Sequence, residues 1–151
     1  MKTPTKYGLI AGILAGSWLI GEHFWELRTP GVATFAGYVG NFVFFTFIFI
    51  SIWTVREKEL GGSIDFKTAM RTGVLTSVYY ALALGLFTFV NYTFINTDFA
   101  SHTANAANDG VGNAKSTGSI IQGVILIIPY TILFGTVISV VISLLMRREK
   151  S

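Results

Sequence analysis

Long stretches without charged residues alternate with short charged segments along this chain. The uncharged stretches cover residues 7–21, 29–55, 72–97 and 116–146. The last three are each longer than the ~20 residues with which a helix crosses ~30 Å of hydrocarbon. Because a backbone in lipid has to satisfy its own hydrogen bonds, the pattern predicts transmembrane helices. We expect spans at residues 7–26, 32–55, 69–96 and 118–146.

The basic residues lie at the ends of these stretches and give the chain a direction. Of its 11 Lys and Arg residues, all but Arg28 and Lys115 fall on one side of the predicted spans. Cytoplasmic loops carry an excess of such residues, so both termini are expected in the cytoplasm. The predicted fold class is an all-α membrane protein, with four transmembrane helices in an antiparallel bundle that forms one domain over residues 1–151.

The composition supports a membrane protein and excludes several other classes. The chain is 52% hydrophobic and 13% charged, whereas soluble domains carry about 25% charged residues. The cations flank apolar spans, where anionic headgroups account for them, so no nucleic-acid partner is expected. Absence of cysteine excludes disulfides and thiolate chemistry. Lys2 and Lys6 precede an apolar run as in a signal peptide, but no A-x-A-like site follows, which predicts a retained first helix.

Small residues recur every four positions on three of the predicted helices. They are Gly8, Gly12 and Gly16, then Gly73, Ser77, Ala81 and Gly85, and finally Gly135, Ser139 and Ser143. Lipid offers no hydrophobic drive for helix association, so such stripes predict faces where backbones approach closely. Packing within one bundle accounts for them, and seams between copies of the chain are the alternative. The second span differs, because its phenylalanines point all round, as in a helix that faces lipid or a partner.

Polar side chains gather toward the predicted outer side of the bundle. A helix that enters at about Tyr7 leaves Glu22 roughly one turn below the outer boundary, and Glu22, His23 and Glu26 continue the glycine face. Groups from other spans at similar depth are Tyr38, Asn41, Asn91 and Gln122. Such groups are costly unless they face protein or water, so together they form a candidate polar pocket. The alternative is that the glutamates reach the headgroups and the amides bond neighbouring helices.

Catalytic and metal-binding patterns are weak in this sequence. Glu22, His23, Glu26 and His102 are of the types that bind zinc, but the first two are adjacent and diverge on a helix, and no H-E-x-x-H occurs. There is also no nucleophile elbow, no phosphate loop and no carboxylate pair in the middle of a span. We therefore expect no metal, no cofactor and no enzymatic activity.

Two segments resemble a known family. Tyr7 to Ile10 open the first span with YGLI, and Gly62 to Gly73 lead into the third with GSIDFKTAMRTG. They are similar to the family called domain of unknown function 4199, four-span membrane proteins common in Bacteroidota with a G-x-[IV]-[ST]-F-x-x-A-x-x-x-G segment. Here Asp65 replaces the usual Ser or Thr and is still a helix-capping type, expected to cap at Thr68. The resemblance implies a bacterial inner membrane and carries no activity.

Packing signals outweigh chemical ones along the chain. We expect a non-enzymatic bacterial inner-membrane protein that is a homo-oligomer or an accessory subunit, in contact with the lipid bilayer and with other subunits or itself. The alternative is a small transporter or ligand-binding sensor that uses the polar pocket, where transport would require oligomers. A wet cavity lined by Glu22, Asn41 and Asn91 would favour ligand binding, and dry amide bonds between helices would favour the scaffold.

Overall fold

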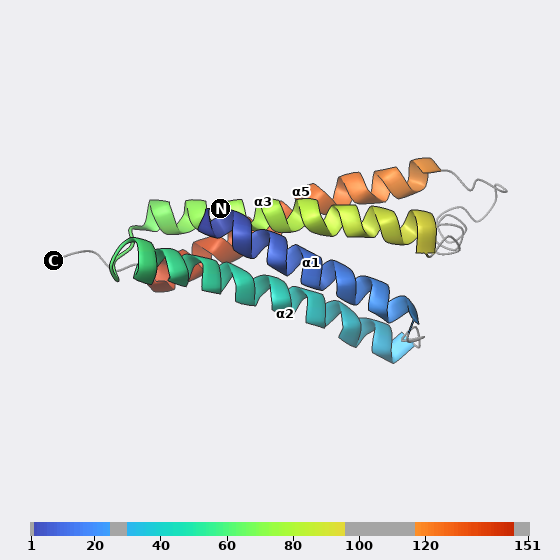
Figure 1. The fold of residues 1–151 in the computed structure, drawn as a ribbon, viewed down its shortest axis with the longest axis horizontal. Coiled ribbons are helices and arrows are strands. Elements are labelled where there is room, and N and C mark those ends of the chain that lie inside the picture. Colours follow the sequence, from blue (N-terminus) through green and yellow to red (C-terminus); the bar gives the residue numbers. More distant parts are fainter. Residues whose placement is uncertain (1, 25–29, 96–116, 147–151) are drawn as a thin grey trace.

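The computed structural model describes residues 2–24, 30–95 and 117–146, and side chains over 2–21, 38–95 and 124–146. This part of the chain is all-helical, with four long helices (Figure 1). Their bounds are Thr3–Phe24 for α1, Pro30–Thr54 for α2, Phe66–Val90 for α3 and Thr117–Met146 for α5. Two π-helical segments extend α2 and α3, namely η1 at Val55–Glu59 and η2 at Asn91–Ile95. Each predicted span overlaps one of the long helices.

Helix α3 is the centre of the bundle. It has its most extensive contacts with α1 and α5, whereas α2 packs mainly against α1 and touches α5 sparsely. α1 and α3 run in the same direction, since Gly8 lies against Thr76 and Gly16 lies against Phe87. α2 and α5 run in the opposite direction (Figure 1). Figure 1 also shows that the α1–α2 pair diverges from the α3–α5 pair toward one end.

Three of the described helices are long and apolar enough to cross a membrane, by length and composition. The stretches are Tyr38–Glu59, Phe66–Ile95 and Val124–Met146. Helix α1 is not among them. Over an apolar 18-residue part of each stretch, 44% of the α3 residues are buried but only 11% of the α5 residues, so α5 presents most of its apolar surface outward. These helices are those of a membrane protein.

Basic side chains mark one end of the bundle. Helix α1 begins there, and η1 joins α2 to the turn that leads into α3 (Figure 1). The exposed cations at this end are Lys2, Lys6, Lys58, Lys67 and Arg71. We call it the basic end, and we call the opposite end, where η2 lies, the far end.

Two glycines form the turn between η1 and α3. Gly61 and Gly62 have φ values of 67° and 93°, a left-handed backbone that favours glycine. The Gly62 N–H donates to the carbonyl of Arg56 at 2.8 Å, and Arg56 Nε donates back to the Gly62 carbonyl at 3.0 Å. Thr3 Oγ1 of α1 donates to the Glu59 carboxylate. Hydrogen bonds within the turn therefore hold its shape, and the hydrogen bond from Thr3 attaches it to the start of α1.

Asp65 caps the N-terminus of α3, as the sequence predicts. Its carboxylate accepts a hydrogen bond from the backbone N–H of Thr68 at 3.0 Å. The side-chain and backbone hydrogen bonds to Thr68 hold the pKa of this exposed carboxyl below its ordinary value of 3.8. The preceding residue, Ile64, is buried in the hydrophobic core. The cap and this buried side chain fix where α3 begins.

The small-residue stripes lie inside the bundle. A Cβ added to Gly12 would be 2.5 Å from the Ala83 Cβ and 2.9 Å from the Tyr80 carbonyl oxygen, closer than packed atoms approach. On α3, Gly73 lies against Ser139, and Ser77 lies against Gly135. The other stripe residues given above as predicted packing positions are buried too. Packing within one bundle thus occupies these faces, and they are not free for contact between copies of the chain.

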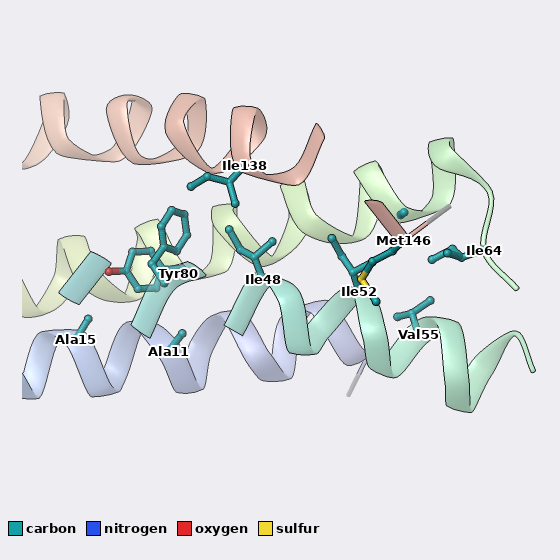
Figure 2. Packing of buried hydrophobic residues seen from close by; sticks show 11 residues of the cluster. Ala11, Ala15, Ile48, Ile52, Val55, Ile64, Tyr80, Ile138 and Met146 are labelled. Atoms are coloured by element: carbon teal, nitrogen blue, oxygen red, sulfur yellow. The ribbon is translucent and has the colours of Figure 1, made fainter. Parts of the chain in front are cut away.

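The basic half of the bundle is closely packed. Figure 2 shows its buried apolar side chains, which include Ile48, Ile52, Val55, Ile64 and Met146. Buried hydroxyls among them are mostly bonded. Thr76 Oγ1 lies 2.8 Å from Ser51 Oγ and 2.9 Å from the Thr72 carbonyl oxygen, which joins α3 to α2. Ser139 and Ser77 donate to carbonyls one turn earlier on their own helices.

Candidate functional site

The predicted polar residues have different surroundings in the structure. Asn41 on α2 is exposed and Tyr38 is 66% exposed, whereas Asn91, the first residue of η2, is 2% exposed. The side chains of Glu22, His23 and Gln122, and all of Glu26, lie outside the described residues, as does His102. Of the described polar candidates, Asn41 lines a cleft that Tyr38 and Asn91 do not line.

This cleft lies in the far half, between α1, α2, α3, η2 and α5. Its volume is about 200 Å³. It is lined by Ala15, Trp18, Leu19, Gly40, Asn41, Tyr80, Leu84, Thr88, Tyr92 and Ile127. None of these side chains carries a charge at neutral pH. The cleft therefore combines hydroxyl, amide and indole groups with apolar walls.

Tyr80 forms the deepest aromatic part of the cleft. Its ring stacks on Phe44 of α2, with centroids 4.3 Å apart and planes at 26°. Both side chains are almost fully buried, at 4% and 2% exposure. Figure 2 shows the Tyr80 oxygen on the side of Ala15, which also lines the cleft. The stacked pair thus holds a phenol group between the closely packed core and the cleft.

Three described residues of the far half have buried oxygen atoms without partners, and one of them, Thr88, lines the cleft. Among the described residues, no hydrogen-bond partner is found for Thr88 Oγ1, Asn91 Oδ1 or Thr93 Oγ1. Leaving such a group unsatisfied costs about 1–3 kcal/mol, so the far half has unused hydrogen-bonding capacity. In the basic half, Ser143 Oγ is also without a partner. The Oδ1 atom of Asn91 accepts no hydrogen bond from a neighbouring helix. Such a bond would have favoured the scaffold interpretation.

Sequence reasoning did not single out Trp18, Tyr80, Thr88 and Tyr92. Trp18, Thr88 and Tyr92 share a signal of position, because each is an amphipathic side chain within about one turn of Glu22 or Asn91. Tyr80 lies about three turns before Asn91 and has no such signal. Projection of α3 alone does not find Tyr80 and Thr88, because the buried positions of that helix face three different neighbours.

A second, apolar groove opens between α2 and α5 where these helices barely touch. It has a volume of about 520 Å³. Its lining residues are Phe45, Thr46, Phe49, Val137, Ile138, Val141 and Ile142. Thr46 donates its hydroxyl to the Phe42 carbonyl at 2.8 Å, so its polar group is already satisfied. The groove offers apolar contact alone.

Metal-binding and acid–base groups do not cluster in the described ranges. No group of three or more His, Asp or Glu side chains lies within reach of a common ion there. The ion pair at the basic end joins Arg56 Nε to Glu57 Oε1 at 3.3 Å, between neighbouring residues. Such a half-exposed pair contributes little to stability. The cleft is accordingly the best-defined candidate site in this part of the chain.

The geometry above is that of an all-helical membrane protein with a small uncharged cleft. The chain belongs to the family described as "Protein of unknown function (DUF4199)", whose family model matches residues 6–148. This match confirms the resemblance carried by the YGLI and GSIDFKTAMRTG segments. No curated protein and no solved structure matches the chain.

Proposed function

We propose that this chain is a non-enzymatic, four-span protein of the bacterial inner membrane that binds a small molecule in the far-half cleft. It would act as a ligand-binding sensor or, as an oligomer, as a small transporter. The observation that carries the proposal is the cleft itself, lined by Asn41, Tyr80 and Thr88, with an unpartnered buried hydroxyl in its wall. A bacterium of the Bacteroidota is the expected source, because the family resemblance implies it.

Membrane energetics support a bound molecule. A polar group at membrane depth is costly when it has no partner, and protein interiors normally satisfy more than nine in ten such groups. Here, the polar groups of the closely packed half are mostly bonded, and three of the far half are not. A ligand in the cleft would supply the partner that Thr88 lacks. Small-molecule sites commonly have this form, with apolar walls and a few polar groups.

The orientation of the chain is part of this proposal. Exposed Lys2, Lys6, Lys58, Lys67 and Arg71 gather at the basic end, which favours a cytoplasmic location for that end and for both termini. The cleft would then open toward the periplasm. α1 would supply the fourth span, packed on α3 through its glycines.

Labelling of introduced cysteines tests the orientation, since the chain has none of its own. A cysteine at Asn108, between α3 and α5, should react with an impermeant thiol reagent on intact spheroplasts. A cysteine at exposed Lys58 should react only after the membrane is opened. The reverse pattern would show that the basic end faces outward.

Two glycine substitutions test ligand binding. A Cβ on Gly40 meets no atom within 4 Å, and Gly40 lines the cleft, so Gly40→Leu places a side chain in or beside it without a backbone clash. Gly21→Leu is the matched control, because Gly21 has equal space and does not line the cleft. Native mass spectrometry of protein from bacterial membranes should show one bound small molecule in wild type and Gly21→Leu but not in Gly40→Leu. Identical spectra for all three proteins would contradict the proposal.

A scaffold or accessory subunit is the second candidate function. It is supported by the apolar groove between α2 and α5, where Phe49 is 48% exposed and Val137 is 63% exposed. A transmembrane helix of a partner, or of a second copy, would fit there, and lipid is the alternative occupant. A photo-crosslinker at Phe49 should then give one discrete protein adduct, and one at Leu82, an exposed residue outside the groove, should give none. Lipid adducts alone at both positions would count against the scaffold.

A further inference from the structure

We propose that the molecule bound in the cleft is a small uncharged ring compound that carries a hydroxyl or carbonyl group. This inference rests on the proposed function, because it names the chemical class of ligand for the same site. Three properties of the cleft lead to it, namely its charge, its aromatic walls and the position of its hydrogen-bonding groups.

The charge of the cleft favours an uncharged ligand. Asn41 and Thr88 offer hydrogen bonds, and no lining residue in the described part of the chain offers a carboxylate, an ammonium or a guanidinium. An ion transferred from water into such surroundings without a counter-charge loses several kcal/mol of solvation, more than a few neutral hydrogen bonds return. A neutral molecule avoids that cost.

The walls and the size of the cleft favour a flat ring. Trp18 comes from α1, Tyr80 from α3 and Tyr92 from η2, which continues α3. Aromatic side chains therefore face the cleft both from α1 and from α3 with its extension. Tyr80 is held in place by its stacking on Phe44. Aromatic rings pack well edge-to-face or offset on one another. Apolar cavities of about 150 Å³ bind benzene, so a volume of about 200 Å³ suits one substituted six-membered ring.

The hydrogen-bonding groups place the substituent between α2 and α3. Asn41 is exposed to the cleft and has both a donor and an acceptor. Thr88 Oγ1 is buried in the wall without a partner. A threonine in a helix populates two χ1 wells, so one rotation turns this hydroxyl toward a ligand. A ring hydroxyl or carbonyl between Asn41 and Thr88 would use both groups.

A fluorescence titration with three probes of one ring size tests this class. Trp25→Phe with Trp53→Phe leaves Trp18, a lining residue, as the single tryptophan in lipid nanodiscs. The probes are phenol, benzoate and phenyltrimethylammonium, which are neutral, anionic and cationic. Phenol should change Trp18 emission saturably, with half-saturation on the order of 1 mM for so small a molecule. The two charged probes should give only a linear, non-saturating response.

Variants on α3 assign the phenol response to the cleft. Thr88→Val keeps the shape of the side chain and removes the hydroxyl, so half-saturation should rise about five- to tenfold, the equivalent of one hydrogen bond. Gly40→Leu should abolish saturation. Thr76→Val, whose hydroxyl bonds Ser51 in the basic half, should leave the phenol titration unchanged. Saturable phenol binding that is unchanged in both Thr88→Val and Gly40→Leu would overturn the inference.

Other outcomes separate the ligand class from the site. Saturation by benzoate or phenyltrimethylammonium that Gly40→Leu removes would overturn the neutral class of ligand and leave the binding function standing. All three probes could give linear responses while native mass spectrometry shows a ligand that Gly40→Leu loses. That result would overturn the ring class alone. Linear responses without any cleft-dependent native ligand would remove both proposals.

Discussion

In both the basic half and the far half of this bundle, α3 packs against α1, α2 and α5. The two halves differ in the hydrogen bonding of their buried polar side chains. In the basic half, Thr76 bonds to Ser51 across two helices, and Ser77 and Ser139 bond within theirs. In the far half, the corresponding groups Thr88 and Asn91 have unbonded oxygens, and a cleft lies beside Thr88. A structural scaffold requires only the first arrangement. The second preserves hydrogen-bonding capacity at a cost in stability, which is typical of binding sites.

The glycines of the bundle also differ in the space around them, and this difference does not follow the two halves, because Gly16 in the far half is as tightly packed as Gly12. Gly12 and Gly73 leave no room for a Cβ, because neighbouring helices touch their backbones. At Gly40, beside the cleft, a Cβ meets nothing within 4 Å. Glycine in the first setting allows close helix packing, whereas glycine in the second leaves open volume.

The largest expected effect comes from filling a glycine contact. Gly12→Leu forces a side chain into Ala83 and the Tyr80 carbonyl and should lower the free energy of unfolding by about 2–3 kcal/mol. Gly40→Leu should cause no loss, since leucine also favours helix by up to ~1 kcal/mol over glycine. Unfolding of both variants in mixed micelles of increasing denaturing detergent measures the difference. Equal stabilities would show that the two glycines have the same surroundings.

A pair of Thr→Val substitutions on α3 has effects of opposite sign. Thr76→Val leaves Ser51 without its partner and should cost about 1 kcal/mol. Thr88→Val removes an unbonded buried hydroxyl and should leave stability unchanged or raise it by up to about 1 kcal/mol. The residues are about 18 Å apart along the helix, so their effects should add in the double variant. A loss of stability in Thr88→Val would mean that its hydroxyl is already bonded, and the contrast between the halves would fail there.

The smallest effect concerns the cap at the basic end. Because hydrogen bonds to Thr68 lower the folded-state pKa of Asp65, the charged cap stabilises the fold above the unfolded pKa. That contribution is lost as the pH falls from the ordinary value of 3.8 through the lowered folded pKa. Asp65→Asn keeps a capping side chain but does not titrate. Thermal midpoints measured in acid should fall further for wild type than for Asp65→Asn, and parallel profiles would contradict the role of this carboxylate.

The sequence predicted features that depend on local rules. Asp65 caps α3 because an aspartate before an apolar helical run can bond the N–H three residues on, and Gly12 lies in a seam because four-residue glycine spacing gives one flat face. It did not predict which phenylalanine of α2 turns inward. Phe44 is 2% exposed and stacks on Tyr80, while Phe42, two residues earlier, is 71% exposed. That choice depends on where α3 lies relative to α2.

The predicted polar pocket and the cleft share one described residue, Asn41. Asn41 was identified because an amide within a span is unusual, and this signal is independent of tertiary structure. Tyr80 and Thr88 are common in spanning helices, so their sequence neighbourhood gives no such signal. They become notable only in the tertiary structure, where both line the cleft with side chains from other helices.

The contact of α1 with α3 has a consequence for how the chain enters the membrane. In the described part of the chain, α1 is not among the stretches apolar enough to cross a membrane, and its glycine face packs on a helix that is translated later. Until α3 has been translated, Gly8, Gly12 and Gly16 have no backbone of α3 to approach. Under the proposed four-span topology, a nascent chain that ends after Thr54 would hold its first helix in the bilayer only through α2. Retention of that helix would then be a late event of biogenesis, completed when α3 packs beside it.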